Sequence, residues 1–163
     1  MAEKMTNFVA ECRALRTQPD WPAQIASAMK RLLAAGDLSD ELRGELEPGQ
    51  LAKIYVQSPD LTIYSVFSEG GLRGPPHDHA TDAIIGLVEG VEQYKTYELN
   101  GERCVETGLK RVTAPAVAVL GTPGPVLPRG QTRTRHLQQR IGAGREAELR
   151  RGGGEVVLIG QPD

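Results

Sequence analysis

Apolar residues in the first 47 positions recur at the spacing of one face of an α-helix. These positions are Phe8, Val9, Cys12, Leu15, Ile25, Met29, Leu32 and Leu33. Two amphipathic helices are expected, separated by Pro19-Asp20-Trp21-Pro22, because proline suits the first turn of a helix. Gly36 is a natural end for the second helix, and a short third helix is predicted after Ser39, ending near Glu47-Pro48-Gly49.

From about residue 50 the pattern changes to short runs of β-branched and aromatic residues, which are typical of strands. The predicted strands are Leu51–Gln57, Leu61–Phe67, Asp82–Val88, Val91–Leu99, Glu102–Glu106 and Ala114–Gly121. Ser58-Pro59-Asp60 is a turn sequence and joins the first two strands into a hairpin. Asn100-Gly101 predicts a second hairpin, because both central positions of its two-residue turn need a positive φ.

Short strands at intervals of about ten residues, with no helical pattern between them, indicate an antiparallel barrel or jelly roll. We therefore expect one mainly β domain over 1–163, with a helical segment at 1–47 packed outside barrel strands at 50–121. The stretch 122–163 differs, because arginine and glycine crowd it and no aromatic residue follows Tyr97. Such a composition forms a barrel wall poorly, so it predicts a solvated segment with one last strand at 155–160.

The length of 163 residues suits one compact domain. The net charge is −2, and acidic and basic residues are spread through most of the chain. This pattern favours neither nucleic acid nor a membrane as partner, so small molecules are expected. Two distant cysteines, Cys12 and Cys104, do not form a disulfide framework. The N-terminus lacks the apolar core of a signal peptide and no apolar run approaches the ~20 residues that cross a bilayer, which predicts a soluble cytoplasmic protein.

The main candidate for chemistry is His77-Asp78-His79, which follows a glycine- and proline-rich stretch. Residues i and i+2 of a strand point to the same face, so His77 and His79 can bind one metal ion while Asp78 points away. Arg73, close to the histidines in sequence, is a candidate for binding an anionic substrate.

This stretch resembles the first signature of the cupin superfamily. Gly71, five residues, His77-Asp-His79 and then Gly90 fit that signature, whereas the glutamate position is occupied by Ala83 or Ile84. Among cupins, a site of histidines without a carboxylate is similar to that of thiol dioxygenases of the cysteine dioxygenase type. The resemblance implies a double-stranded β-helix barrel and Fe(II) as cofactor, with Ni, Zn or Mn as alternatives.

The resemblance also implies a third histidine after a Pro-x-Gly turn. His136 is the remaining histidine and follows Pro128-Arg129-Gly130, but at five residues' separation where the family has about two. If Ala114–Gly121 is instead the strand that leads to this ligand, its position falls within 122–127, where there is no histidine. Both interpretations stay open.

Three further expectations concern the surroundings of the metal. Where the related enzymes hold the substrate carboxylate with an early arginine, the corresponding strand here offers Lys53. Asp82 is placed to accept a hydrogen bond from a ligating imidazole. The related enzymes also use a late tyrosine, whereas the tyrosines of this chain are Tyr55, Tyr64, Tyr94 and Tyr97.

The function that this resemblance implies is a metal-dependent dioxygenase that oxidises a small thiol to a sulfinate with O2. One alternative is a cupin oxygenase that cleaves a carbon–carbon bond, and the other is a cupin that binds a small molecule without catalysis. The expected partners are the small-molecule substrate and O2, and a homodimer is an open option.

Overall fold

The computed structural model describes residues 2–68, 82–100, 103–120, 137–142 and 153–160. The helices are Glu3–Leu15 (α1), Trp21–Ala34 (α2) and Leu38–Gly44 (α3). The strands are Ala52–Gln57 (β1), Leu61–Ser68 (β2), Ala83–Glu89 (β3), Val91–Asn100 (β4), Arg103–Thr113 (β5), Ala116–Leu120 (β6), Leu137–Gly142 (β7) and Gly153–Gly160 (β8). None of the helices in these ranges is long and apolar enough to cross a membrane.

The three helices begin and end largely where the local sequence predicts. Pro22 lies in the first turn of α2, and Gly36, with φ 66°, follows its end. The third helix begins at Leu38, one residue before Ser39, and ends at Gly44 rather than near Pro48. The predicted helical segment is thus confirmed, with a shorter third helix.

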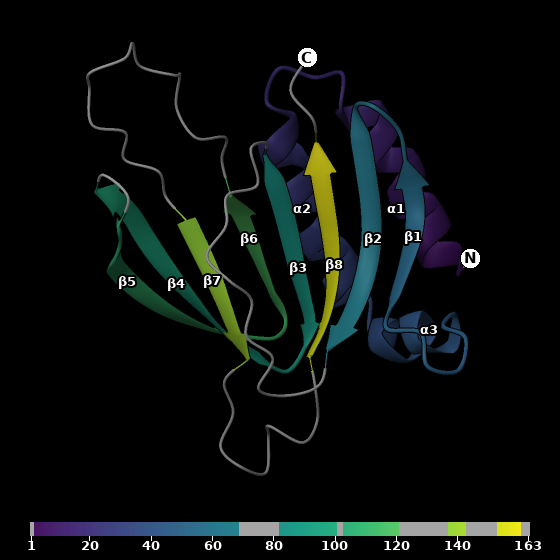
Figure 1. Ribbon diagram of the computed structural model, residues 1–163. Helices are drawn as coiled ribbons and strands as arrows, with labels where there is room; N and C mark the ends of the chain where they lie inside the picture. The colour runs from purple at the N-terminus through teal and green to yellow at the C-terminus, as the bar shows by residue number, and fades with distance from the viewer. Residues whose placement is uncertain (1, 69–81, 101–102, 121–136, 143–152, 161–163) are drawn as a thin grey trace.

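The strands form two antiparallel sheets that face each other (Figure 1). One has five strands in the order β1-β2-β8-β3-β6, and the other has three in the order β5-β4-β7. Consecutive strands β3 and β4 lie in different sheets, joined by a turn at Gly90 whose φ is 86°. This arrangement confirms the predicted mainly β antiparallel barrel, or jelly roll, with an N-terminal helical segment.

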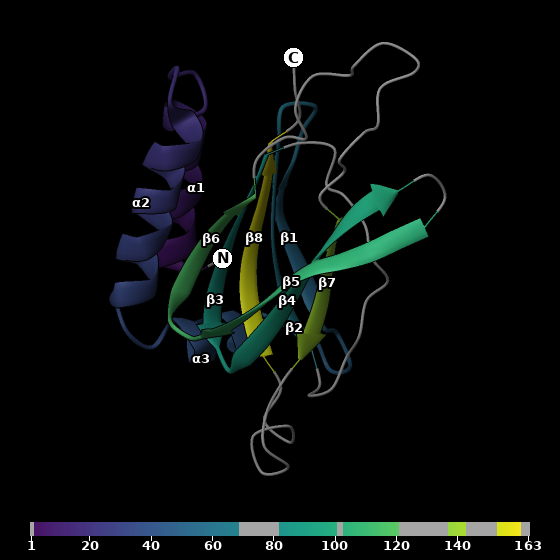
Figure 2. The same ribbon diagram turned by 90° about the vertical axis from the view of Figure 1, so that its left-hand side faces the viewer.

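The helices cover the outer face of the five-stranded sheet only (Figure 2). Along β2, the side chains of Leu61, Ile63 and Phe67 pack into the helical core, and on β3 Ile84 does the same. The helical members of this core are Met5, Phe8, Val9, Cys12, Ile25, Ala26, Ala28, Met29, Leu32, Leu38 and Leu42. Because strand side chains alternate, the intervening residues of β2 and β3 face the barrel interior.

The C-terminal region corrects one prediction. Residues 137–142 form β7, which pairs with β4 in the three-stranded sheet, although this stretch was expected to lie outside the barrel wall. The predicted last strand is confirmed as β8, which lies between β2 and β3. Pairing of its backbone with β4 stabilises β7 even though its composition is poor in β-branched residues, which explains why propensity alone failed for this strand.

Gly86 allows α2 to pack closely on β3. A Cβ atom at this position would lie 2.7 Å from Met29 Sδ and 2.9 Å from Met29 Cγ, and Met29 is fully buried. Leu33 Cδ1 would lie 3.6 Å from the same Cβ atom. Because Met29 is fully buried, its side chain has little room to move aside. The contact explains a glycine in a strand interior, where this residue is otherwise unfavourable.

We predict that Gly86→Val lowers the free energy of unfolding by about 1–3 kcal/mol, because the added methyl groups overpack the α2–β3 contact. Urea denaturation followed by circular dichroism measures this change. Gly44→Ala is the matched control, since nothing lies within 4 Å of a Cβ there, and its stability should be unchanged or slightly higher. Equal effects of the two substitutions would contradict the packing argument.

Candidate functional site

The barrel interior is lined by the residues of the five-stranded sheet that alternate with the helix-facing ones. On β3, Ala83, Ile85 and Leu87 are buried but lie outside the helical core. On β2, the corresponding residues Thr62, Tyr64 and Val66 are half-buried. Solvent therefore reaches the inward face of β2, whereas the inward face of β3 is covered.

The three-stranded sheet contributes a buried carboxylate to the interior. No described helix covers this sheet, so its buried face is the one turned toward the five-stranded sheet (Figure 2). Glu92 is 1% exposed and Tyr94 is 8% exposed on this face, and Tyr94 Oη donates a hydrogen bond to Glu92 Oε2 at 2.5 Å. A buried carboxylate needs such a donor, because desolvation without one is costly.

Sequence reasoning did not single out Glu92, because a charged residue in a strand is usually solvated. A signal was present in the alternation of β4, since Glu92 and Tyr94 share one face. Glu92 lies near the end of the barrel that contains the Gly90 turn. It is about 20 Å along the barrel from the start of β3, at the usual strand rise per residue, and so cannot replace the carboxylate missing at Ala83.

The predicted metal ligands His77, His79 and His136, and Arg73 with them, lie outside the described residues. Within the described ranges, no group of three or more His, Cys, Asp or Glu side chains could hold a metal ion. The structure does describe the strand ends next to these segments: His79 precedes the start of β3 by four residues, and His136 directly precedes β7.

Strand directions bring these two starts to the same end of the barrel (Figure 1). The chain turns back at Gly90, so β4 runs opposite to β3, and β7 is antiparallel to β4. Strands β3 and β7 therefore run in the same direction on facing sheets. Ala83 and Leu137, their first residues, lie at a common end, which we call the upper end.

The described residues at the upper end fit a site without a protein carboxylate at the signature position. Ala83 is fully buried and faces inward, so the glutamate position of the cupin signature contributes a methyl group there. Asp82 is half-buried directly before β3. Its role as hydrogen-bond partner of an imidazole stays a prediction.

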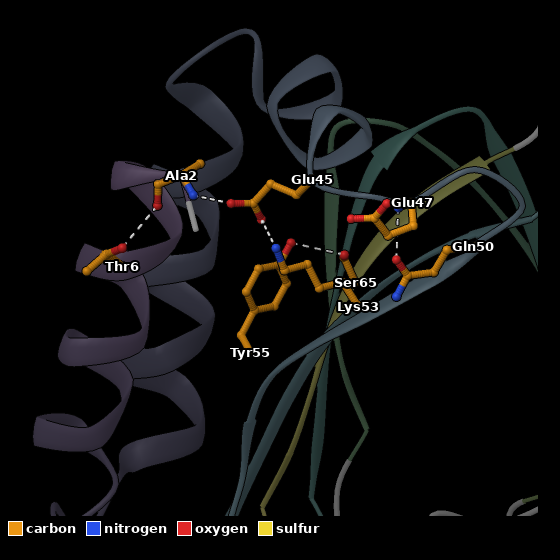
Figure 3. A network of polar contacts seen from close by, with 8 residues as sticks. All are labelled: Ala2, Thr6, Glu45, Glu47, Gln50, Lys53, Tyr55 and Ser65. Carbon is orange, nitrogen blue, oxygen red and sulfur yellow. Dashed lines mark hydrogen bonds and ion pairs between the residues drawn. The ribbon is translucent and has the colours of Figure 1, made fainter.

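Lys53 lies on the helical side of the five-stranded sheet (Figure 3). Its cross-strand partner is Ser65, which points to the face of β2 opposite the interior residues. The hydroxyl groups of Ser65 and Tyr55 are hydrogen-bonded at 3.2 Å. Lys53 Nζ lies 3.5 Å from Glu45 Oε2 and 5.8 Å from the centroid of the Tyr55 ring. Its role in substrate binding stays a prediction.

Ionisation in this cluster is set by burial and hydrogen bonding. Burial raises the pKa of the Tyr55 phenol to about 12. Burial also acts to raise the pKa of Glu45, but hydrogen bonds from the Ala2 backbone N–H and the Tyr55 side chain, together with the Lys53 charge, hold this pKa below its usual value. The cluster ties α1, the end of α3 and β1 together.

Both cysteines are free thiols. Cys12 is buried in α1, and burial raises its pKa to about 12, so it remains a protonated thiol with little reactivity. Cys104 is exposed on β5. The predicted absence of a disulfide between them is confirmed.

Comparison with known proteins supports the fold and extends no further. The sequence matches no protein-family model, and it matches no curated protein. A solved structure from Bacillus halodurans aligns with a TM-score of 0.54 at 8% identity, covering 78% of this chain and 80% of that one. At this identity the similarity shows the fold alone.

Two further solved structures align with lower scores. An RmlC-like cupin from Shewanella frigidimarina gives a TM-score of 0.46 at 13% identity, covering 68% of this chain and 75% of that one. A conserved protein with a double-stranded β-helix domain from Klebsiella pneumoniae gives 0.47 at 13% identity, covering 73% and 85%. The described architecture is an antiparallel barrel or jelly roll with an N-terminal helical segment, and the comparisons do not show a thiol dioxygenase subtype.

We expect Tyr94→Phe to lower the free energy of unfolding by about 1–3 kcal/mol, because the buried Glu92 carboxylate loses the phenolic donor. Thermal and urea unfolding measure the change. Tyr97→Phe removes the same hydroxyl from the opposite face of β4, and it should cost about 1 kcal/mol or less. If both substitutions were equally harmless, the hydrogen bond inside the barrel would not be a stabilising one.

The lowered pKa of Glu45 predicts that the free energy of unfolding depends on pH. In the unfolded chain Glu45 titrates near its ordinary pKa of about 4.3, so the native state gains stability above that value and loses it as pH falls through the lower native pKa. Glu45→Gln should therefore cost about 1–2 kcal/mol at pH 7, and the gap to wild type should narrow below about pH 4. Glu47→Gln, at an exposed site nearby, serves as control.

Proposed function

We propose that this protein is a metal-dependent dioxygenase that oxidises a small thiol to a sulfinate. The observation that supports the proposal is the common direction of β3 and β7. Because of it, the segment with His77-Asp-His79 and the residue His136 adjoin strands that begin at the same end of the barrel. Three imidazoles would be a donor set suited to Fe(II), and also to Ni or Zn, with Mn the least favoured.

The link between β2 and β3 is long enough to carry its histidines to that end. Strand β2 ends at the Gly90 end of the barrel and β3 starts at the upper end, so the fourteen residues 69–82 connect points at opposite ends of the barrel. Fourteen residues span at most about 50 Å when extended, more than twice the ~20 Å length of β3. His77 and His79 are the ninth and eleventh of these fourteen residues, close in sequence to the start of β3.

The proposed reaction converts a thiol RSH and O2 into a sulfinic acid RSO2H. The sulfur forms a bond to each oxygen atom while the O–O bond breaks, and the thiol proton moves to an oxygen of the sulfinic acid. The sulfur loses four electrons, which O2 takes up, so no other oxidant or reductant is required. A metal held by the three imidazoles would supply the site at which sulfur and dioxygen react.

The described residues contribute surroundings that suit a small substrate. The covered inward face of β3, with Ala83, Ile85 and Leu87, is apolar and excludes water on that side. The absence of a side-chain carboxylate at Ala83 leaves the ligand set neutral, so an anionic thiolate is not repelled there.

The test is metal content and oxygen uptake of purified protein reconstituted with Fe(II). We expect close to one iron per chain in wild type, and at least a tenfold loss of iron affinity in His77→Ala and His79→Ala. Asp78→Ala is the matched control, because a residue between two same-face positions points to the other face of a strand. His136→Ala decides whether His136 is the third ligand.

Product analysis separates the proposal from its alternatives. A thiol dioxygenase consumes one O2 per thiol and yields a product with two added oxygen atoms by mass spectrometry. Stoichiometric metal without turnover of any thiol would contradict the proposal and favour a binding protein. Oxygen uptake with a diketone substrate, but not with thiols, would favour carbon–carbon cleavage.

A further inference from the structure

Strand β5 forms the longest open edge among the described strands. The edge strands are β1 and β6 in the five-stranded sheet, and β5 and β7 in the three-stranded one. Strand β5 has eleven residues, whereas none of the other three has more than six. An open edge carries a row of backbone N–H and C=O groups that can pair with a further strand. Val105 and Leu109 of β5 are 48% and 58% exposed, so this edge also presents apolar side chains.

The outer part of the β4–β5 hairpin contains two strands. Strand β7 pairs with β4 from Glu92 to Tyr97, so among the described strands no third one continues beyond Tyr97. Figure 2 shows the hairpin extending away from the helices. A two-stranded ribbon is only marginally stable in water. A strand added to β5 would give this part of the sheet a third member.

The side chains of β5 keep to defined faces on both sides of a bulge. Pairing with β4 leaves one extra residue in β5, directly after Glu106. Lys95 lies on the outer face of the sheet because it alternates with the buried Tyr94, and Glu106 forms an ion pair of 2.6 Å with it. Leu109 is the cross-strand partner of Lys95, and Arg111 follows two residues later, so both share the outer face. The interior side of β5 carries Val105, Lys110 and Val112.

We infer that β5 is a dimerisation strand, which pairs with β5 of a second copy of this chain about a two-fold axis at Leu109. Such an axis makes the two strands antiparallel and brings the same edge of both copies together. With the bulged residue left out of the count, Leu109 meets Leu109 of the second copy, and Glu106 lies opposite Arg111 of the second copy. On the interior side Val105 lies opposite Val112 of the second copy. The symmetry forms each of the last two pairs twice.

Charge complementarity identifies a second copy in this register as the occupant of the edge. Slipping the strands by two residues in one direction sets Lys110 opposite Lys110 of the second copy. Slipping them in the other direction sets the apolar Leu109 opposite Glu106, and a further slip sets Glu106 opposite Glu106. Opposite charges stabilise a cross-strand pair and like charges destabilise it, so the register centred on Leu109 is favoured. The inference does not depend on the proposed function, because dimerisation is measured without metal or substrate.

The first test is sedimentation velocity of the full chain at about 1–100 μM. Wild type should approach twice the chain mass of 17.6 kDa at the upper concentrations. Leu109→Lys sets two like charges face to face and should weaken dimerisation at least tenfold. Ile54→Lys is the matched control, because Ile54 is also 58% exposed and lies on the edge strand β1. It should leave the dimer unchanged.

The second test is disulfide trapping, which reports the register. The proposed pairing sets Cys104, an exposed free thiol, opposite Thr113 of the second copy. Directly opposite residues of antiparallel strands have Cα separations within the range that a disulfide spans. Thr113→Cys should therefore give a covalent dimer on mild oxidation, seen by non-reducing electrophoresis. The same substitution combined with Cys104→Ser should not.

Loss of the dimer in Leu109→Lys alone, together with a cross-link that requires Cys104, supports the inference. A monomeric mass at every concentration overturns it and leaves this edge to a different protein. A dimer that survives Leu109→Lys, or that Ile54→Lys abolishes, places the interface elsewhere. A cross-link that is absent, or that forms equally without Cys104, contradicts the register. Species larger than a dimer also contradict the inference, because a closed two-fold pair leaves no open β5 edge.

Discussion

The close packing of α2 on β3 decides which face of the five-stranded sheet can meet a ligand. Because Gly86 has no side chain, α2 packs so closely on β3 that Met29 occupies the space where a Cβ atom would lie. The helices thereby seal one face with a continuous apolar core that includes alternate residues of β2. Polar chemistry on this sheet is left to the opposite face, where Thr62 and Tyr64 are half-buried.

Strand alternation explains why residues close in sequence differ in what they can do. Ser65 and Tyr64 are neighbours, yet Ser65 is sealed beneath the helices and Tyr64 faces the other sheet. Lys53 shares the face of Ser65 and is engaged by Glu45 at the end of α3. Lys53, near the start of β1, therefore lies on the helical side of the sheet, whereas Tyr64 on β2 lies on the interior side.

Much of the fold could be predicted from local signals. Ser58-Pro59-Asp60 separates β1 from β2 as predicted, and Gly90, whose φ is 86°, separates β3 from β4. The second hairpin is shifted by one residue, because Asn100 still belongs to β4 and pairs with Arg103. Strand β5 is longer than predicted, since its pairing with β4 extends to Thr113 around an irregularity near Thr96. Strand β7 could not be predicted, because its stability comes from pairing with a strand far away in sequence.

The candidate site was predictable only in part, for a related reason. Two histidines two residues apart can be recognised from spacing alone, whereas the direction of Tyr64 depends on which face the helices cover. Glu92 was missed because its burial is a property of two facing sheets. The position of β8 between β2 and β3 has a further consequence, for the order of assembly. Strands β2 and β3 each have an unpaired edge until β8, which is synthesised much later, inserts between them. Closure of this sheet is therefore slow, and the unpaired edges can pair wrongly during synthesis.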